Sequence, residues 1–378
     1  MHAGVQENLP TRRAARARMQ SPKRATSRSR LTFTSTPTMT SSPPVYTIDL
    51  HLQGTPNAVA AHVIAGFDGH IVIDCGPEST IPTLLEGIRA VGLEPEEIRH
   101  IVLTHIHLDH AGAAGKLARM FGAQVYVHAR GAPHLLDPSK LLASASKIFG
   151  SRMRVLWGGI ESVPESQLTV LEGARVPWFE SGTLDLLTDQ NLLDQNLLDQ
   201  NLLELSGHHL RAYHTPGHAS HHLIYAWQTA DGLAVFAGDL AGVRLPGSQI
   251  PIPPTPPPEV DLSAWSESLE LLTALEPSRL YLTHFGPIDD VHEHLTRLQT
   301  NLIKVGALSL EAVQSGQSNR WLSVKLRAAL GITPAKAGSW SVGSMGEADA
   351  QGLERYWFKH HPELIPAVLI QARSRKQA

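Results

Sequence analysis

Three imidazoles and one carboxylate fall within six residues, in the run Thr-His-Ile-His-Leu-Asp-His from Thr104 to His110. Imidazole nitrogen and carboxylate oxygen are the ligand types that suit Zn²⁺, Fe or Mn²⁺. Four such groups this close together cannot all face a dry core unless a cation pairs with them. The run therefore predicts a metal site.

The elements around this run predict where it lies. Residues 99–103 (Arg-His-Ile-Val-Leu) indicate a buried strand, so the cluster follows the carboxyl end of a strand, where open sheets bind ligands. Three further motifs place a His or Asp where a strand ends, beside a Gly or Pro that lets the backbone bend sharply. They are His214-Thr215-Pro216-Gly217-His218, Gly238-Asp239 and Thr283-His284. We expect all four to converge on one point.

Hydrophobic periodicity predicts an α/β protein, an αββα sandwich of two half-sheets packed face to face with helices outside. The predicted strands are 45–52, 58–65, 70–74, 100–104, 124–128, 167–172, 183–187, 208–213, 222–228, 233–237 and 280–282. The predicted helices are 79–91, 111–121, 130–136, 139–150, 261–275, 289–313, 319–330 and 346–375.

Composition narrows the class of protein. The chain has 378 residues with 42% hydrophobic and 18% charged residues, which is typical of a globular protein, and no apolar run approaches the roughly 18 residues of a membrane span. Cys75 is the single cysteine, so neither a disulfide framework nor a cysteine metal site can form within the chain. This composition favours a cytoplasmic protein.

The first 44 residues differ from the rest. Residues 1–30 hold eight basic side chains against one acidic one, and the leader is rich in Ser, Thr and Pro, which predicts disorder. Its composition also resembles a transit peptide, but we favour an extension without function, with Met39 as an alternative start. Since the whole chain has a formal charge of −3, residues 31–378 carry −10, which argues against nucleic-acid binding.

Two low-complexity segments carry no predicted chemistry. Residues 189–203 repeat Asp-Gln-Asn-Leu-Leu three times, and a period of five fits neither helix nor strand, so we interpret this segment as an expanded loop or hairpin arm. The proline run from Pro251 to Pro258 must be extended, because proline fixes φ and has no amide hydrogen. We interpret it as a stiff connector to the next helix.

Together these motifs resemble the metallo-β-lactamase fold superfamily of metallohydrolases. The His-x-His-x-Asp-His run, Pro-Gly-His at 216–218, Gly-Asp at 238–239 and Thr-His at 283–284 match its ligand pattern, and Asp74 matches its early Asp-x-Gly strand end. The resemblance covers Val45 to Pro287 and is followed by a helical tail like that of glyoxalase II-like members. Composition and the resemblance together predict three regions: a disordered basic leader at 1–44, a catalytic domain at 45–288 with the repeat inserted, and a C-terminal helical region at 289–378.

The resemblance also implies two divalent metal ions, with Zn²⁺ favoured and Fe or Mn²⁺ as alternatives. The implied ligands are His105, His107 and His218 for the first ion, Asp109, His110 and His284 for the second, and Asp239 as a bridge. Asp109 is in addition the candidate catalytic residue. We expect Asp74 and His222 to orient ligands by hydrogen bonds rather than to bind metal.

The roles of other residues are less clearly indicated by the sequence. We interpret five histidines as ordinary core or surface residues: His100, His128, His208, His209 and His214. Three residues near the motifs are candidates for substrate contact, namely Arg244, Tyr225 and Tyr281. Cys75 is interpreted as a small buried apolar residue, with a redox role beside Asp74 as the alternative.

The implied activity is hydrolysis of a small ester, thioester or lactone by a hydroxide that bridges the two ions, as in hydroxyacylglutathione hydrolase. The alternative is a sulfur oxygenase similar to persulfide dioxygenase, with one iron held by part of the same ligand set. His107 argues against the flavodiiron oxygen reductases, which have Glu at that position. The expected partner is a small-molecule substrate, with no nucleic acid and no membrane, and the sequence leaves the oligomeric state open.

Overall fold

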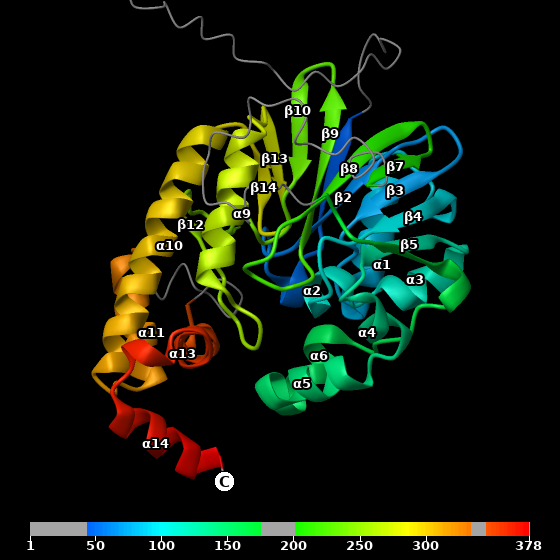
Figure 1. Ribbon diagram of the computed structural model, residues 1–378. Helices are drawn as coiled ribbons and strands as arrows, with labels where there is room; N and C mark the ends of the chain where they lie inside the picture. The colour runs from blue at the N-terminus through cyan, green and yellow to red at the C-terminus, as the bar shows by residue number, and fades with distance from the viewer. Residues whose placement is uncertain (1–43, 175–200, 334–344, 378) are drawn as a thin grey trace, which may run out of the picture. The chain divides into compact units, whose positions relative to one another are not determined.

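The first half of the chain forms a sheet of six strands in the order β1-β2-β3-β4-β5-β6. In the computed structural model, which describes residues 44–174, 201–333 and 345–377, β1 to β3 pair antiparallel and β3 to β6 pair parallel (Figure 1). The strands are Val45–Asp49 (β1), Ala60–Ile64 (β2), His70–Ile73 (β3), Ile98–Val102 (β4), Gln124–His128 (β5) and Leu168–Leu171 (β6).

The second half forms another six-stranded sheet, in the order β14-β13-β10-β9-β8-β7. Its strands pair antiparallel except β10 and β13, which are parallel and joined through a helix. The strands are Leu202–Leu205 (β7), His208–His214 (β8), Leu223–Thr229 (β9), Gly232–Phe236 (β10), Arg279–Leu282 (β13) and Gly286–Ile288 (β14). A short ribbon pairs Val243–Arg244 (β11) with Pro251–Ile252 (β12).

Both faces of the first sheet are buried, which explains why its strands are apolar almost throughout. One face packs on the second sheet, where Ile71 and Val102 meet Tyr225 and Phe236. The other face packs under helices, where Val63 and Ile101 lie in one cluster with residues of α1 (Ile81–Ala90) and α3 (Ala114–Phe121). Strands buried on both faces lose the polar alternation of a half-exposed sheet.

The remaining helices complete the outer layers. Figure 1 shows α1 and α3 beside the first sheet and α9 and α10 beside the second, which confirms the αββα sandwich. The helices besides α1 and α3 are Leu108–Ala111 (α2), Ala132–Leu136 (α4), Ser139–Phe149 (α5), Met153–Trp157 (α6), Leu262–Ala274 (α9), Val291–Gln314 (α10), Asn319–Ala329 (α11), Glu347–His360 (α13) and Ala367–Gln377 (α14). Of these, α13 packs against α10 and α11.

Two predicted helices are interrupted. The helix predicted at 111–121 splits into α2 and α3, because the Ala113 amide donates to the Gly76 carbonyl instead of continuing the helix. The helix predicted at 346–375 breaks between His360 and Ala367, because Pro362 and Pro366 remove amide hydrogens and disfavour helical backbone before them.

Some strands also differ from prediction. The last leucines of the pentapeptide repeat, Leu202 and Leu203, belong to β7 and pair antiparallel with β8, which agrees with a hairpin arm at this end of the repeat and not with a loop. The first two residues of the proline run form β12 instead of a plain connector, and β14 was not predicted. The strand predicted at 183–187 lies outside the described residues.

All described residues fall in one compact unit, and the boundary at residue 288 stays a prediction. Among the described residues, none of the helices has the length and apolar character needed to cross a membrane.

Candidate metal centre

Four loops that each follow a strand bring the seven predicted ligands together. The loop after β4 leads into α2 and carries His105, His107, Asp109 and His110, and the turns after β8, β10 and β13 carry one ligand each. These last three are His218, Asp239 and His284. Because β4 belongs to the first sheet and the others to the second, the site lies where the two sheets meet.

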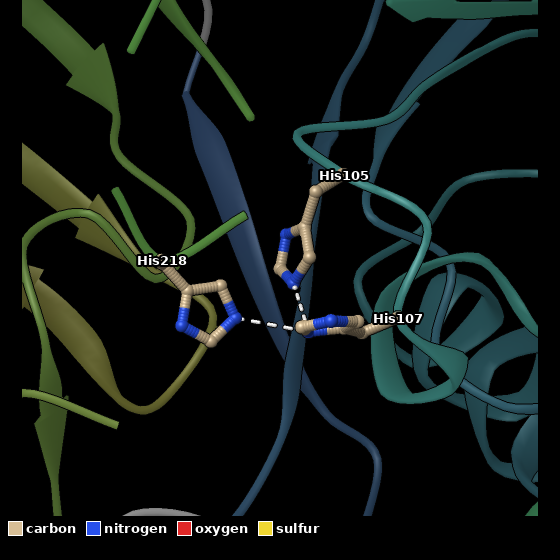
Figure 2. Close-up of side chains that lie close together, drawn as sticks. All are labelled: His105, His107 and His218. Atoms are coloured by element: carbon tan, nitrogen blue, oxygen red, sulfur yellow. Dashed lines mark hydrogen bonds between the residues drawn. The ribbon is translucent and has the colours of Figure 1, made fainter. Parts of the chain in front are cut away.

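The first cluster consists of three histidines whose ring nitrogens converge (Figure 2). His105 Nε2 lies 3.0 Å from His107 Nδ1, and His218 Nε2 lies 2.9 Å from the same His107 nitrogen. His107 is the most exposed of the three, since the other two are fully buried. Three convergent imidazole nitrogens are a common zinc-ligand set.

The second cluster combines two histidines with a carboxylate. His110 Nε2 lies 3.3 Å from His284 Nε2, and His284 Nε2 lies 3.4 Å from Asp109 Oδ2. The other Asp109 oxygen lies 3.9 Å from His110 Nε2. All three side chains are buried, so their polar atoms face one another and not bulk water.

Asp239 joins the two clusters. Its Oδ2 lies 3.3 Å from His218 Nε2 of the first cluster. Its Oδ1 lies 3.4 Å from His110 Nε2 and 3.5 Å from His284 Nε2 of the second. One carboxylate therefore presents one oxygen to each cluster, as a bridging ligand does.

Most of the histidines are fixed through the ring nitrogen that faces away from the cluster. Such outer hydrogen bonds set the tautomer and the direction of the ligating lone pair. The pairs are His110 Nδ1 with Asp74 Oδ2 at 2.8 Å, His284 Nδ1 with the Ala58 carbonyl at 2.7 Å, His218 Nδ1 with the Pro254 carbonyl at 2.9 Å and His105 Nδ1 with Thr104 Oγ1 at 3.1 Å.

Asp74 and His222 lie where the sequence predicted supporting residues. His222 Nε2 accepts a hydrogen bond from the Asp239 amide at 3.2 Å, and its Nδ1 contacts Thr215 Oγ1. Asp74 accepts from the hydroxyls of Thr104 and Thr283 besides contacting His110. Sequence reasoning missed both threonines as supports, although each directly precedes a histidine ligand in its motif.

Gly217 explains why a glycine must precede His218. Its φ is +143°, and a Cβ there would lie 2.4 Å from the Trp265 Cα of α9. Only glycine fits both the backbone conformation and the close approach of the helix. The packing of α9 therefore fixes the turn that carries His218.

Electrostatics distinguish the two clusters. In the first, burial lowers the pKa of His107 to about 3, and burial together with the neighbouring imidazoles lowers the pKa of His105 well below its usual value. Burial also lowers the pKa of His218. All three imidazoles are therefore neutral at pH 7, which leaves their lone pairs available to a metal.

In the second cluster, opposite charges dominate. Burial opposes protonation of His110, but the carboxylates of Asp239, Asp74 and Asp109 outweigh it and raise its pKa well above the usual value. Burial opposes ionisation of Asp109, but His110 and His284 lower its pKa to about 2. Both pKa shifts arise because the buried carboxylates of this cluster attract positive charge.

The donor set fits divalent metal cations. Asp239 Oδ1 is buried and receives no hydrogen bond from the part of the chain that the structure describes. Within the same residues, every ion pair of Asp74, Asp109 and Asp239 is with a histidine, and none is with Lys or Arg. Nitrogen and oxygen ligands around buried negative charge suit Zn²⁺, Fe or Mn²⁺.

The chain matches a known protein family. The family model of the metallo-beta-lactamase superfamily matches residues 54–284, a span that includes all seven candidate ligands. The chain belongs to this superfamily. The metallo-beta-lactamase fold-containing protein ST1585 of Sulfurisphaera tokodaii is 26% identical over 249 residues, which cover 64% of this chain and 79% of the relative.

Two further proteins are similar to this chain. Metallo-beta-lactamase family protein TTHA1429 of Thermus thermophilus has a TM-score of 0.58 at 19% identity, over 83% of this chain and 93% of that one, which supports the shared fold. N-acyl homoserine lactonase AttM of Rhizobium johnstonii is 29% identical over 15% of this chain and 30% of its own length.

Of the three candidates for substrate contact, Tyr225 and Tyr281 are core residues, and Arg244 stays a prediction. Tyr225 is fully buried and its hydroxyl donates to the Leu103 carbonyl at 2.7 Å. Tyr281 is buried between the sheets and stacks on Phe236 with ring centroids 5.0 Å apart. The Arg244 guanidinium pairs with Asp290 at 3.1 Å. The two tyrosines pack within the fold, whereas the ion pair of Arg244 does not test a contact with substrate.

The five histidines interpreted as ordinary residues all lie outside the two clusters. His100 contacts the Tyr126 hydroxyl, His208 the Ala65 carbonyl and His214 the Ser220 carbonyl. His128 stacks on His214, and His209 lies near Glu204. Cys75 is buried, which raises the pKa of its thiol and makes it an inert small residue.

Proposed function

We propose that this chain is a metal-dependent hydrolase that cleaves a small ester, thioester or lactone. It would use two divalent metal ions, of which Zn²⁺ is the favoured one. The observation that carries the proposal is the position of Asp239, whose two oxygens face one cluster each. A carboxylate in this position can bind two cations at once, which supports a site with two ions over one with a single ion.

When bound, such a pair of ions lowers the pKa of a water between them toward about 7 and polarises the oxygen of the scissile acyl group. The chain's own residues hold and orient the reacting groups. Asp109 has the most exposed carboxylate of the site, with 8% of its side chain accessible against 2% for Asp239 and 1% for Asp74. We assign it the catalytic role of accepting a hydrogen bond from the attacking water.

The substrate class rests on charge and on similarity. The acidic chain beyond residue 30 favours a small molecule over a nucleic acid, and no described helix is suited to a membrane. The short likeness to a protein named as an N-acyl homoserine lactonase favours a lactone, whereas the helical tail favours a thioester such as an acylglutathione. Both bonds break by attack at an acyl carbon, so one site can serve either.

Metal analysis combined with a substrate panel tests the proposal. Purified full-length protein is assayed for metal content and then against thioesters, lactones, simple esters and phosphodiesters, with Asp239→Ala purified in parallel as the inactive control. We expect about two Zn²⁺, Fe or Mn²⁺ per chain and hydrolysis of an acyl substrate that the control loses. One iron per chain with oxygen uptake on glutathione persulfide would overturn the proposal in favour of a sulfur oxygenase.

A further inference from the structure

We propose that Asp349, in helix α13 of the C-terminal region, is a positioning residue for the ligand His218 and acts through the peptide group between Pro254 and Thr255. The inference rests on the proposed function in one respect, because it takes His218 to be a metal ligand. It assigns a role to two features that the hydrolytic site itself does not explain, the proline run and the helical tail.

The geometry places one peptide group between the two side chains. The Pro254 carbonyl accepts a hydrogen bond from His218 Nδ1 at 2.9 Å. The amide of Thr255, which belongs to the same peptide group, donates to Asp349 Oδ1 at 2.9 Å. His218, Thr255 and Asp349 are at most 4% exposed, so water does not compete for either bond.

The sequence of the proline run agrees with this role. Between Pro253 and Pro258, Thr255 is the only residue that is not proline and therefore the only one with an amide hydrogen. The run offers a series of carbonyl acceptors with a single donor among them. That donor lies next to the carbonyl that holds His218, and it is the one that Asp349 binds.

Helix α13 contacts the proline run at several further points, and these contacts fix the position of Asp349 relative to the run. Thr255 Oγ1 donates to the Asp349 carbonyl at 3.2 Å, and Arg355 Nε donates to the Pro258 carbonyl at 3.1 Å. A Cβ on Gly352 would lie 2.0 Å from the Thr255 carbonyl oxygen, so only glycine allows this approach. The second Asp349 oxygen accepts from the Gly346 amide at 2.9 Å, which locks its rotamer.

The physical effect follows from the polarity of the chain of bonds. A carboxylate that accepts from an amide forms a charge-assisted hydrogen bond and polarises the peptide group. The carbonyl at the other end then accepts more strongly from His218 Nδ1, which keeps the proton on Nδ1 and the lone pair on Nε2. Asp349 thus does for His218, through a peptide group, what Asp74 does for His110 directly.

Cobalt binding to metal-free, full-length protein tests the inference without relying on activity. Two binding steps are followed by the Co²⁺ visible spectrum and assigned with the ligand variants His105→Ala and His284→Ala. Burial raises the pKa of Asp349 to about 6, so the titration is run near pH 8, where the side chain is ionised. Asp349→Ala and Thr255→Pro each remove one side of the bond between Asp349 and the Thr255 amide.

Each variant has a matched control. Thr255→Val loses the hydroxyl but keeps the amide that Thr255→Pro removes. Glu354→Gln removes another carboxylate of α13, one that pairs with Arg373 and not with the proline run. We expect Asp349→Ala and Thr255→Pro to weaken Co²⁺ at the first cluster about tenfold and to shift its spectrum, while the second cluster changes less than about twofold. The controls should bind both ions like the wild type.

The outcomes separate this inference from the proposed function. If Asp349→Ala lowers the melting temperature but leaves both Co²⁺ affinities unchanged, or weakens both clusters equally, Asp349 is merely structural and the inference is wrong. Wild-type protein that binds two Co²⁺ ions but hydrolyses no acyl substrate would contradict the proposed function and leave the inference about Asp349 intact. Wild-type protein that binds no Co²⁺ at the first cluster would overturn both.

Discussion

Asp74 Oδ2 lies 2.8 Å from His110 Nδ1, and the same oxygen accepts hydrogen bonds from the Thr104 and Thr283 hydroxyls. These residues follow β3, β4 and β13, so one carboxylate ties together strand ends from both sheets. Burial opposes ionisation of Asp74, but His110 and the donated hydrogen bonds outweigh it and lower its pKa. Asp74 is therefore an ionised link between the sheet junction and a candidate metal ligand.

This link predicts a specific loss on mutation. Asp74 has φ +51°, a left-handed conformation that Asn tolerates, so Asp74→Asn keeps the backbone and shape while it removes the charge. We expect metal affinity at the second cluster to fall about 10- to 100-fold, because His110 loses its anionic acceptor and keeps at most a neutral amide oxygen. Metal titration measures this effect, with the exposed-turn variant Asp231→Asn as control. Equal affinities in Asp74→Asn and wild type would contradict the assigned role.

Metal removal should expose the bridging role of Asp239. Metals that bind only the folded state stabilise it by about 2.7 kcal/mol at 100 times their dissociation constant, so excess chelator should lower the melting temperature of the wild type. In Asp239→Ala the shift should be at most half as large, because both clusters lose a shared ligand. Thermal unfolding with and without chelator gives the answer, and Asp289→Asn, which changes an exposed ion pair, serves as control. An undiminished shift in Asp239→Ala would rule out the bridge.

The sequence predicted much of this site because its ligands are local signals. Each ligand lies in a short motif at the end of an apolar strand, and strand ends on one edge of a sheet must meet. The αββα layers followed from hydrophobic patterns in the same way. The residue types of these motifs indicated metal binding, because clusters of His and Asp beside Gly and Pro seldom serve packing alone.

The supports of those ligands could not be predicted. The carbonyls of Ala58 and Pro254 hold His284 and His218 across 226 and 36 residues, and any residue type supplies a carbonyl. β14 has three residues, one of them Pro287, which is too few for a periodic pattern. β7 was hidden in a repeat whose period fits no strand, and its pairing with β8 fixed it instead. Tertiary contacts decided each of these features.

Mutation of Tyr225 tests whether this residue serves stability or substrate contact. Its hydroxyl donates to the buried Leu103 carbonyl, so Tyr225→Phe leaves an acceptor without this donor and should cost about 1–3 kcal/mol of unfolding free energy. We expect kcat/KM to stay within about twofold of wild type, because the side chain is fully buried and its hydroxyl binds a backbone carbonyl. Denaturant unfolding and steady-state kinetics measure the two effects. A large fall in kcat/KM with unchanged stability would restore Tyr225 as a substrate contact.

The last prediction concerns pH and the contact between α10 and the loop after Asp239. His294 is buried, its Nε2 donates to the Ala241 carbonyl at 2.7 Å and its Nδ1 accepts from Arg244 Nε at 3.1 Å, so it is neutral. Burial, assisted by the Arg244 guanidinium, lowers its pKa to about 4 despite the Ala241 carbonyl. The unfolded chain has the ordinary value of about 6.5 and therefore binds the proton first as pH falls.

The sign follows from this difference. Above pH 6.5 the stabilisation by neutral His294 is fully present, and it is lost as pH falls from about 6.5 to 4, up to about 3 kcal/mol. His294→Gln should be less stable than wild type near pH 8, and the gap should shrink toward pH 4.5, because glutamine does not titrate. Urea unfolding across this range measures the gap, with the exposed α10 variant His292→Gln as control. A gap that stays constant with pH would show that His294 acts by packing alone and not as a neutral, buried imidazole.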